Sequence, residues 1–72
     1  MAELRFFGYL SEIAGMRTKV VALDRPARLR DMIPPSFPEK NIIILINEKP
    51  ATLDSEVTNQ DTVVLMPILS GG

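Results

Sequence analysis

The order of apolar and polar residues along the chain predicts a small sheet with short connections. Residues 3–7 alternate well enough for a strand that buries Leu4 and Phe6 and leaves Phe7 on the opposite face. Residues 18–23 are rich in β-branched side chains and predict a second strand, returning beside the first. An outward phenylalanine at the end of the first strand requires an explanation.

Two helices are predicted from the spacing of apolar residues. Residues 9–14 carry apolar side chains at helical spacing, and Gly15 is a natural C-terminal cap. A second, principal helix is expected to begin near Pro26, which suits a first helical turn, and to end at the proline pair 34–35. The side of this helix that faces the sheet is expected to consist of Leu29, Met32 and Ile33.

The second half of the sequence predicts further strands separated by turns. Residues 42–46 are apolar at every position, which is typical of a central strand covered on both faces. After a turn at 47–50, residues 51–57 predict a short irregular strand, and residues 62–66 predict the closing strand. The expected fold class is therefore α+β, with a mixed four- to five-stranded sheet packed on one main helix plus a short helix.

A single helix covers only one face of such a sheet. If alternate residues of the strand 42–46 face the helix, the others point away from it. The apolar side chains expected on the uncovered face are Phe7, Ile43, Leu45, Val64 and Met66. A contiguous exposed apolar surface usually marks a site for a partner. The alternative is that loops or a second copy of the chain cover this surface.

Composition and charge exclude several classes of protein. A chain of 72 residues allows one domain, residues 1–72, and its 46% hydrophobic and 24% charged residues are typical of a globular protein. Eight basic and nine acidic residues are scattered singly, so no stripe is present for nucleic acid. The longest apolar run, residues 42–46, is too short to span a membrane, and the first residues do not resemble a signal peptide. We expect a soluble, cytoplasmic protein.

The sequence contains no histidine and no cysteine. It therefore cannot form a Ser-His-Asp triad, a cysteine nucleophile or a His-ligated metal centre. The carboxylate pairs Glu48 with Asp54 and Asp54 with Glu56 are better explained as solvated turn residues than as acid–base pairs. We expect no active site in this chain alone, no metal and no stably bound cofactor.

The sequence ends in Gly71-Gly72, shortly after Pro67. Glycine has no Cβ, so a diglycine carrying a free carboxylate can enter a channel too narrow for other residues. Pro67 cannot donate a ladder hydrogen bond and tends to mark where a strand gives way to a tail. Residues 67–72 are expected to form a flexible C-terminal tail. The alternative is an ordinary frayed terminus.

Two segments carry a resemblance to a known family. Residues 5–15 read Arg-Phe-Phe-Gly-Tyr-Leu-Ser-Glu-Ile-Ala-Gly, and residues 61–72 read Asp-Thr-Val-Val-Leu-Met-Pro-Ile-Leu-Ser-Gly-Gly. With Asn47 after the third strand, they resemble the ubiquitin-like β-grasp sulfur carriers of the ThiS/MoaD superfamily. The expected helix at residues 9–14 makes the chain most similar to the small subunit of molybdopterin synthase, because the thiamine sulfur carrier resembles a shorter version without it.

The resemblance implies a chemistry and two partners. A ubiquitin-activating-type enzyme uses ATP to adenylate Gly72, and sulfur then replaces one carboxylate oxygen to give a thiocarboxylate. The large subunit of molybdopterin synthase then receives this sulfur. By the same resemblance Gly71 provides steric clearance, and Phe7 and Met66 anchor the partner. The arm that carries the glycines into the partner consists of Pro67, Ile68, Leu69 and Ser70.

Three functions from different classes are compatible with this sequence. The first is a sulfur carrier, for molybdopterin or alternatively for thiamine or transfer-RNA thiolation. The second is a protein modifier, in which an activated Gly72 forms an isopeptide bond with a target lysine. The third is a binding module in which the glycine pair has no chemical role.

Overall fold

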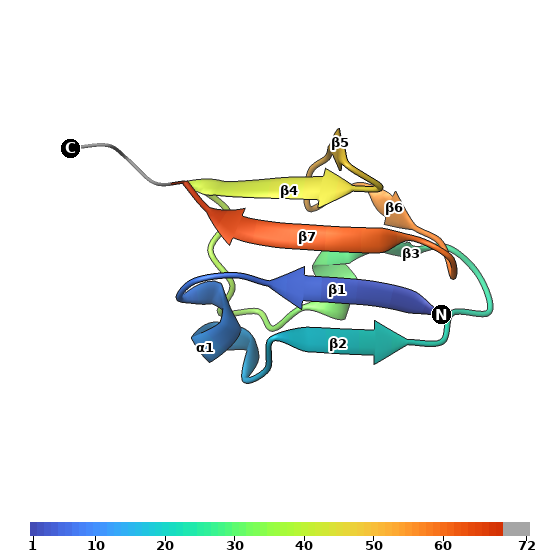
Figure 1. Cartoon of the computed structure of the whole chain (residues 1–72). Coiled ribbons are helices and arrows are strands. Elements are labelled where there is room, and N and C mark those ends of the chain that lie inside the picture. Colours follow the sequence, from blue (N-terminus) through green and yellow to red (C-terminus); the bar gives the residue numbers. More distant parts are fainter. Residues whose placement is uncertain (69–72) are drawn as a thin grey trace.

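The computed structural model, which describes residues 1–68, contains one mixed five-stranded sheet (Figure 1). Its strand order is β2-β1-β7-β4-β5, and β1 and β7 are parallel while the other neighbours are antiparallel. The bounds of these strands are β1 Ala2–Phe6, β2 Thr18–Val21, β4 Ile42–Ile46, β5 Lys49–Pro50 and β7 Thr62–Pro67. This confirms the expected α+β β-grasp class with a mixed sheet.

The first two strands form where the alternating pattern predicts them. In β1 the side chains of Ala2, Leu4 and Phe6 are buried, so every second residue faces the core. β2 lies antiparallel beside β1, with Leu4 opposite Lys19. The expected burial of Leu4 and Phe6 is confirmed.

The central strand of the sheet is β7. It pairs in parallel with β1 and antiparallel with β4, and its Leu65 lies opposite both Phe6 and Ile44. The expectation that residues 42–46 form a central strand covered on both faces is wrong. β4 has only the two-residue β5 on its other side, and its Ile43 is 40% exposed while Ile44 is buried. A fully apolar run does not itself show whether both faces are covered.

A tight hairpin connects β4 to β5. Asn47 and Glu48, with φ of 52° and 69°, form its two-residue loop between the paired residues Ile46 and Lys49. Positive φ at both loop positions matches the twist of the flanking strands. The expected strand over residues 51–57 is wrong in extent, because only Glu56–Val57 (β6) is extended there, and a turn at residues 53–55 precedes it.

The principal helix expected between Pro26 and the proline pair 34–35 does not form. Residues Ala27–Arg28 form a short strand, β3, paired with β6, and Leu29–Met32 form a single 3₁₀ turn, η1. The backbone N–H of Leu29 donates to Ser55 O and that of Arg30 to Leu53 O. These bonds tie the segment to its neighbouring loop, and Ile33, which precedes a proline, is extended (φ −127°, ψ 160°). Too few residues remain for an α-helix.

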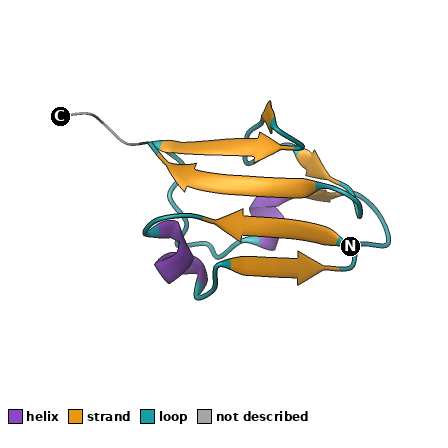
Figure 2. Cartoon of the chain, viewed as in Figure 1, coloured by secondary structure: helices purple, strands orange, loops and turns teal. Residues whose placement is uncertain are grey.

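The 3₁₀ turn nevertheless performs the packing role expected of the helix. Residues three apart lie on one face of a 3₁₀ turn, so Leu29 and Met32 are both buried against the sheet. Figure 2 shows the turn behind the sheet and the other helix at the end of the sheet. That second helix, α1 (Leu10–Ala14), ends at Gly15 with φ of 77°, as predicted.

One apolar cluster fills the space between the sheet and the segments behind it. Sequence analysis did not identify Phe37, which lies in the loop before β4 and is buried. Its ring centroid is 5.8 Å from that of Phe6, at a tilted angle of 58°. The loop therefore supplies cover that a longer helix would otherwise give. The buried members of the cluster are Ala2, Leu4, Phe6, Leu10, Leu29, Met32, Phe37, Ile44, Leu53, Val57, Val63 and Leu65.

Asn47 and Asp61 fix the start of β7 against the end of β4. The Asn47 side chain donates to Asp61 Oδ1 (2.9 Å) and accepts from the N–H of Thr62 (3.0 Å). Asp61 Oδ2 accepts from the N–H of Thr58 (2.7 Å), and the N–H of Glu3 donates to Asp61 O. The hydrogen bond from Thr58, followed by that from Asn47, lowers the pKa of Asp61 below its ordinary value. This network joins three strands at one corner of the sheet.

Replacing Asp61 by alanine should make the protein less stable and less sensitive to acid. A lowered pKa in the folded state means that ionised Asp61 contributes stability above the unfolded pKa, near 4, and that this contribution is lost as pH falls through the folded pKa. We expect D61A to lower the free energy of unfolding by about 1 kcal/mol at pH 7, because the carboxylate is largely solvated. The difference from wild type should shrink in denaturant titrations below about pH 4.

D24A is the matched control, since Asp24 lies in an exposed turn and has no hydrogen-bond partner among residues 1–68. A D61A penalty that is equal at pH 7 and below pH 4 would contradict the proposed role of the ionised carboxylate.

Candidate functional site

Apolar side chains from the end of β1, from β4 and from β7 gather on the face of the sheet that is turned away from the core. Because β7 pairs with both β1 and β4, the outward side chains of neighbouring strands lie opposite one another. Met66 lies opposite Ile43, and Val64 lies opposite Leu45. Phe7 follows directly after β1, and its N–H donates to Leu65 O (2.9 Å), which places it beside Met66. The register therefore gathers residues from three separate segments. We call this set the outer apolar face: Phe7, Ile43, Leu45, Val64 and Met66.

The described loops do not cover the outer apolar face. Phe7 is 49% exposed and Ile43 is 40% exposed, whereas the other three side chains are partly buried by their neighbours. The expectation that Phe7 lies opposite the core is thus confirmed. Covering by loops, the alternative from the sequence, does not occur at Phe7 or Ile43.

A groove with entirely apolar lining occurs at one end of this face. It is lined by Phe7, Gly8, Met66 and Pro67, from the β1–α1 turn and from the end of β7. In Figure 1 the end of β1, the end of β7, the start of β4 and helix α1 all lie at the same end of the sheet. We call this the Phe7 groove. It offers an open apolar surface to an apolar group of a partner.

The last described residues leave the sheet beside the Phe7 groove. Pro67 is the final residue of β7 and is partly exposed, and Ile68 is exposed with its N–H bonded to Asn41 O (2.9 Å). The other predicted tail residues, Leu69, Ser70, Gly71 and Gly72, lie outside the described residues.

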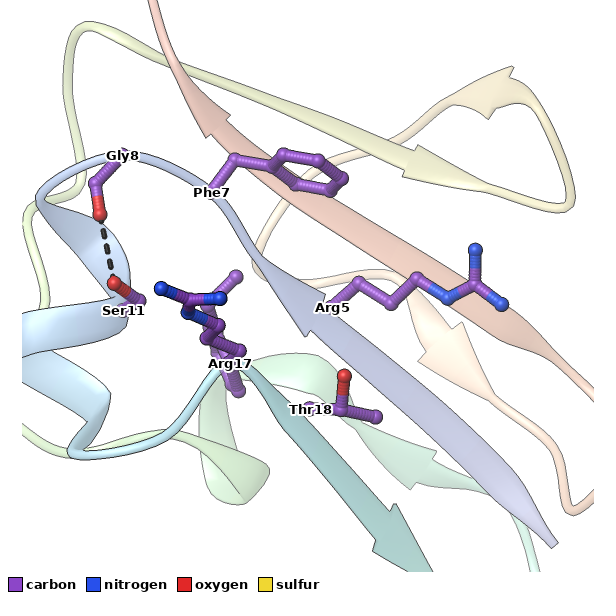
Figure 3. Close-up of a pocket in the computed structure, with 7 residues that line it drawn as sticks. Arg5, Phe7, Gly8, Ser11, Arg17 and Thr18 are labelled. Atoms are coloured by element: carbon purple, nitrogen blue, oxygen red, sulfur yellow. Dashed lines mark hydrogen bonds between the residues drawn. The ribbon is translucent and has the colours of Figure 1, made fainter.

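A second hollow borders Phe7 on the side of β2 (Figure 3). It is lined by Arg5, Phe6, Phe7, Gly8, Ser11, Arg17 and Thr18. Figure 3 shows the Arg17 guanidinium on the side of Ser11 and the Arg5 guanidinium on the side of β7. Arg5 is ion-paired with Glu3, and the Ser11 hydroxyl donates to Gly8 O (2.9 Å). We call it the basic hollow. Arg5 already has the Glu3 carboxylate as a partner, whereas Arg17 makes no ion pair among residues 1–68, so Arg17 is available to a carboxylate of a partner.

The candidate carboxylate pairs do not form an acid–base site in the described structure. Asp54 accepts a hydrogen bond from Arg30 (3.1 Å), and Glu39 also pairs with Arg30. Glu39 and then Asp54 raise the pKa of Arg30 above its ordinary value. These exposed pairs connect loops behind the sheet. Within residues 1–68, no three acidic side chains cluster closely enough to hold a metal ion.

Sequence analysis missed Gly8, Arg5 and Arg17 as parts of the site. The position of Arg5 could have been found, because it alternates with Leu4 and Phe6 and must share a face with Phe7. Arg17 precedes β2 in a turn, where no period applies. Gly8 gave only the weak signal of a glycine between a strand and a helix, and its positive φ of 58° is known only from the structure.

The model of the ThiS family matches residues 4–72 of this chain. The chain therefore belongs to the ThiS family, a group of small β-grasp proteins within the ThiS/MoaD-type, ubiquitin-like sulfur carriers and modifiers. The resemblance inferred from residues 5–15 and 61–72 is confirmed at this level. No match was found among curated protein sequences.

Solved structures from Haloferax volcanii and Pyrococcus furiosus have the same fold as this chain. The crystal structure of SAMP1 from Haloferax volcanii is 26% identical, with a TM-score of 0.73 over 99% of this chain and 98% of that chain. A putative molybdopterin converting factor, subunit 1, from Pyrococcus furiosus is 20% identical, with a TM-score of 0.67 over 94% of this chain and 97% of that chain.

Among residues 1–68, no helix has the length and apolar character needed to cross a bilayer.

Replacing Phe7 by aspartate should weaken the docking of a partner while leaving the fold intact. Since Phe7 is 49% exposed, only about half of its apolar area is buried, so its loss should lower the free energy of unfolding by about 1 kcal/mol. An aromatic anchor at the centre of an interface typically costs more than about 2 kcal/mol when removed. Affinity for the activating enzyme that the resemblance leads us to expect should therefore fall roughly 30-fold or more. Isothermal titration calorimetry and thermal unfolding measure the two effects.

V20D is the matched control. Val20 is 57% exposed and shares the outer side of the sheet, but it lies opposite Glu3, at the other end of β1 from Phe7. Equal losses of affinity in F7D and V20D would show that the partner does not use the Phe7 groove, and unfolding of F7D would contradict the assignment of the sheet faces.

Proposed function

We propose that the protein is a sulfur carrier whose Gly72 carboxylate is adenylated and converted to a thiocarboxylate. The observation that carries the proposal is the match of the ThiS family model, which extends from β1 through the glycine pair at residues 71–72. The outer apolar face supports it, because it offers a docking surface next to the segment that leads to this carboxylate. The proposed role needs no active site in the chain itself.

The proposed chemistry has two steps. A Gly72 carboxylate oxygen attacks the α-phosphorus of ATP; an O–P bond forms, the bond to the β-phosphate oxygen breaks, and pyrophosphate leaves. A hydrosulfide-equivalent then attacks the carbonyl carbon; a C–S bond forms, the C–O bond to AMP breaks, and AMP leaves. The first step is necessary because a carboxylate is a poor electrophile. The chain has no cysteine, so sulfur is carried at Gly72 and not as a persulfide.

The proposed partners are a ubiquitin-activating-type adenylating enzyme and the large subunit of molybdopterin synthase. Both would need Gly72 in their own active sites, and both would dock on the outer apolar face. The chain would then bind them one at a time. Such partners should carry an apolar residue for the Phe7 groove and a carboxylate for the basic hollow. Because activation consumes ATP, we place this cycle in the cytoplasm.

A second candidate function is protein modification. SAMP1, a small archaeal modifier protein of Haloferax volcanii, is similar to this chain over nearly its whole length. In this alternative a lysine Nζ attacks the Gly72 acyl-adenylate; an amide forms and AMP leaves. Donation of sulfur to thiamine or to transfer RNA would use the same thiocarboxylate. All these routes share the adenylation of Gly72 and differ only in the acceptor.

Mass spectrometry of the C-terminal peptide distinguishes these functions. The protein is incubated with its adenylating enzyme, ATP and sulfide, and a parallel sample also receives host extract. We expect the mass increase of sulfur replacing one oxygen at Gly72. Host proteins carrying lysine-linked Gly-Gly remnants, without thiocarboxylate in the purified reaction, would favour the modifier.

A variant lacking Gly72 is the control, because it keeps residues 1–68 and the outer apolar face. It should bind the adenylating enzyme but acquire no sulfur. A wild-type terminus that stays unchanged with active enzyme would overturn the proposed function and favour a binding module.

A further inference from the structure

Two contacts hold the end of β7 from opposite sides. On the β1 side, the ring of Pro67 lies against Gly8, where an added Cβ would be 3.0 Å from Pro67 Cγ and 3.3 Å from Pro67 Cδ. On the β4 side, the N–H of Ile68 donates to Asn41 O at 2.9 Å. Pro67 has no N–H, so the bond at Ile68 is the first that the chain can donate after Met66. Residues 67 and 68 are therefore held between the two flanking strands.

Glycine at residue 8 lets the β1–α1 turn approach Pro67 closely. Gly8 has a φ of 58°, a left-handed conformation that side chains disfavour, and a Cβ there would require the proline ring to move by a few tenths of an ångström. Its carbonyl oxygen accepts bonds from the N–H and the hydroxyl of Ser11, which fix the turn onto α1. Asn41, on the other side, has a φ of 62°, which asparagine tolerates better than most residues.

We propose that Gly8 is a positioning residue for the reacting end of the chain: with Asn41, it clamps Pro67 and Ile68 and so sets the point and direction from which the following residues depart. This rests on the proposed function, because the clamp matters for activation only if Gly72 is adenylated. Gly8 and Asn41 act through Pro67 and Ile68 and do not touch the reacting carboxylate.

The length of the remaining segment makes the direction of departure important. From Ile68 to Gly72 the chain can reach at most about 14 Å. When a partner holds this segment extended, as the proposed function requires, a rotation of about 10° at its base would displace its end by roughly 2 Å. A misplacement of about 1 Å in a reacting group can lower a rate roughly 100-fold. A loosened base also lowers the fraction of molecules whose carboxylate is in place, while the five residues of the outer apolar face are unchanged.

The test compares G8A with G15A. Both glycines have positive φ, so both variants carry a similar backbone penalty, but a Cβ at Gly15 meets nothing within 4 Å. With the adenylating enzyme, we expect G8A to lower kcat for ATP–pyrophosphate exchange roughly 10- to 100-fold, with the dissociation constant changed less than about threefold. G15A should leave both values near wild type. Hydrogen exchange at the Ile68 amide should accelerate in G8A and not in G15A.

Removing the ring that the new Cβ would meet should rescue the variant. In the P67A background, the G8A substitution should lower kcat at least about tenfold less than it does in the wild-type background. The reason is that residues in contact couple in a double-mutant cycle. Equal kcat in G8A and G15A would overturn the clamp. A loss in G8A confined to the dissociation constant would also overturn it, because Gly8 would then act only as a lining residue of the Phe7 groove. No exchange with wild type would overturn the proposed function, and the Ile68 amide would still decide whether Gly8 holds this segment.

Discussion

The pairing of β7 with both β1 and β4 is the constraint on which the rest of the structure depends. Its register puts Val63 and Leu65 into the core beside Leu4, Phe6 and Ile44. The same register sends Val64 and Met66 to the other side, among the residues of the outer apolar face. Because strand side chains alternate strictly, a shift of one residue would exchange the core set and the outer set. The asparagine–aspartate network at the start of β7 fixes this register at one end, and the Pro67 contact with Gly8 holds it at the other.

Sequence reasoning succeeded where a local pattern determines the outcome. Alternation placed Leu4 and Phe6 inside and Phe7 outside, and a glycine after a short apolar turn ended α1 at Gly15. It failed where tertiary contacts decide. The 3₁₀ turn has the same apolar spacing over one turn as an α-helix, and only its bonds to the loop at residues 53–55 distinguish the two. Burial of Phe37 in a loop has no periodic signal at all.

The candidate site shows the same division between features set by local sequence patterns and features set by tertiary contacts. Its apolar residues could be predicted, because each is an outward position of a recognisable strand. Its shape could not, since the Phe7 groove and the basic hollow combine residues from the β1–α1 turn, β2 and β7, brought together by the parallel pairing of the first and last strands of the sheet. The chemistry that we propose rests on family membership, because the geometry of residues 1–68 does not by itself indicate a reaction.

The position of β7 also has a consequence for synthesis of the protein. Until residues 62–67 have been made, β1 and β4 have no strand between them, so the sheet cannot close during earlier translation. A chain terminated before residue 62 would lack both the central strand and two of the five residues of the outer apolar face, Val64 and Met66. A chain that stops before residue 62 therefore has neither a closed sheet nor the complete face on which we propose that partners dock. The strand order by itself makes such truncated copies unfit for the proposed docking.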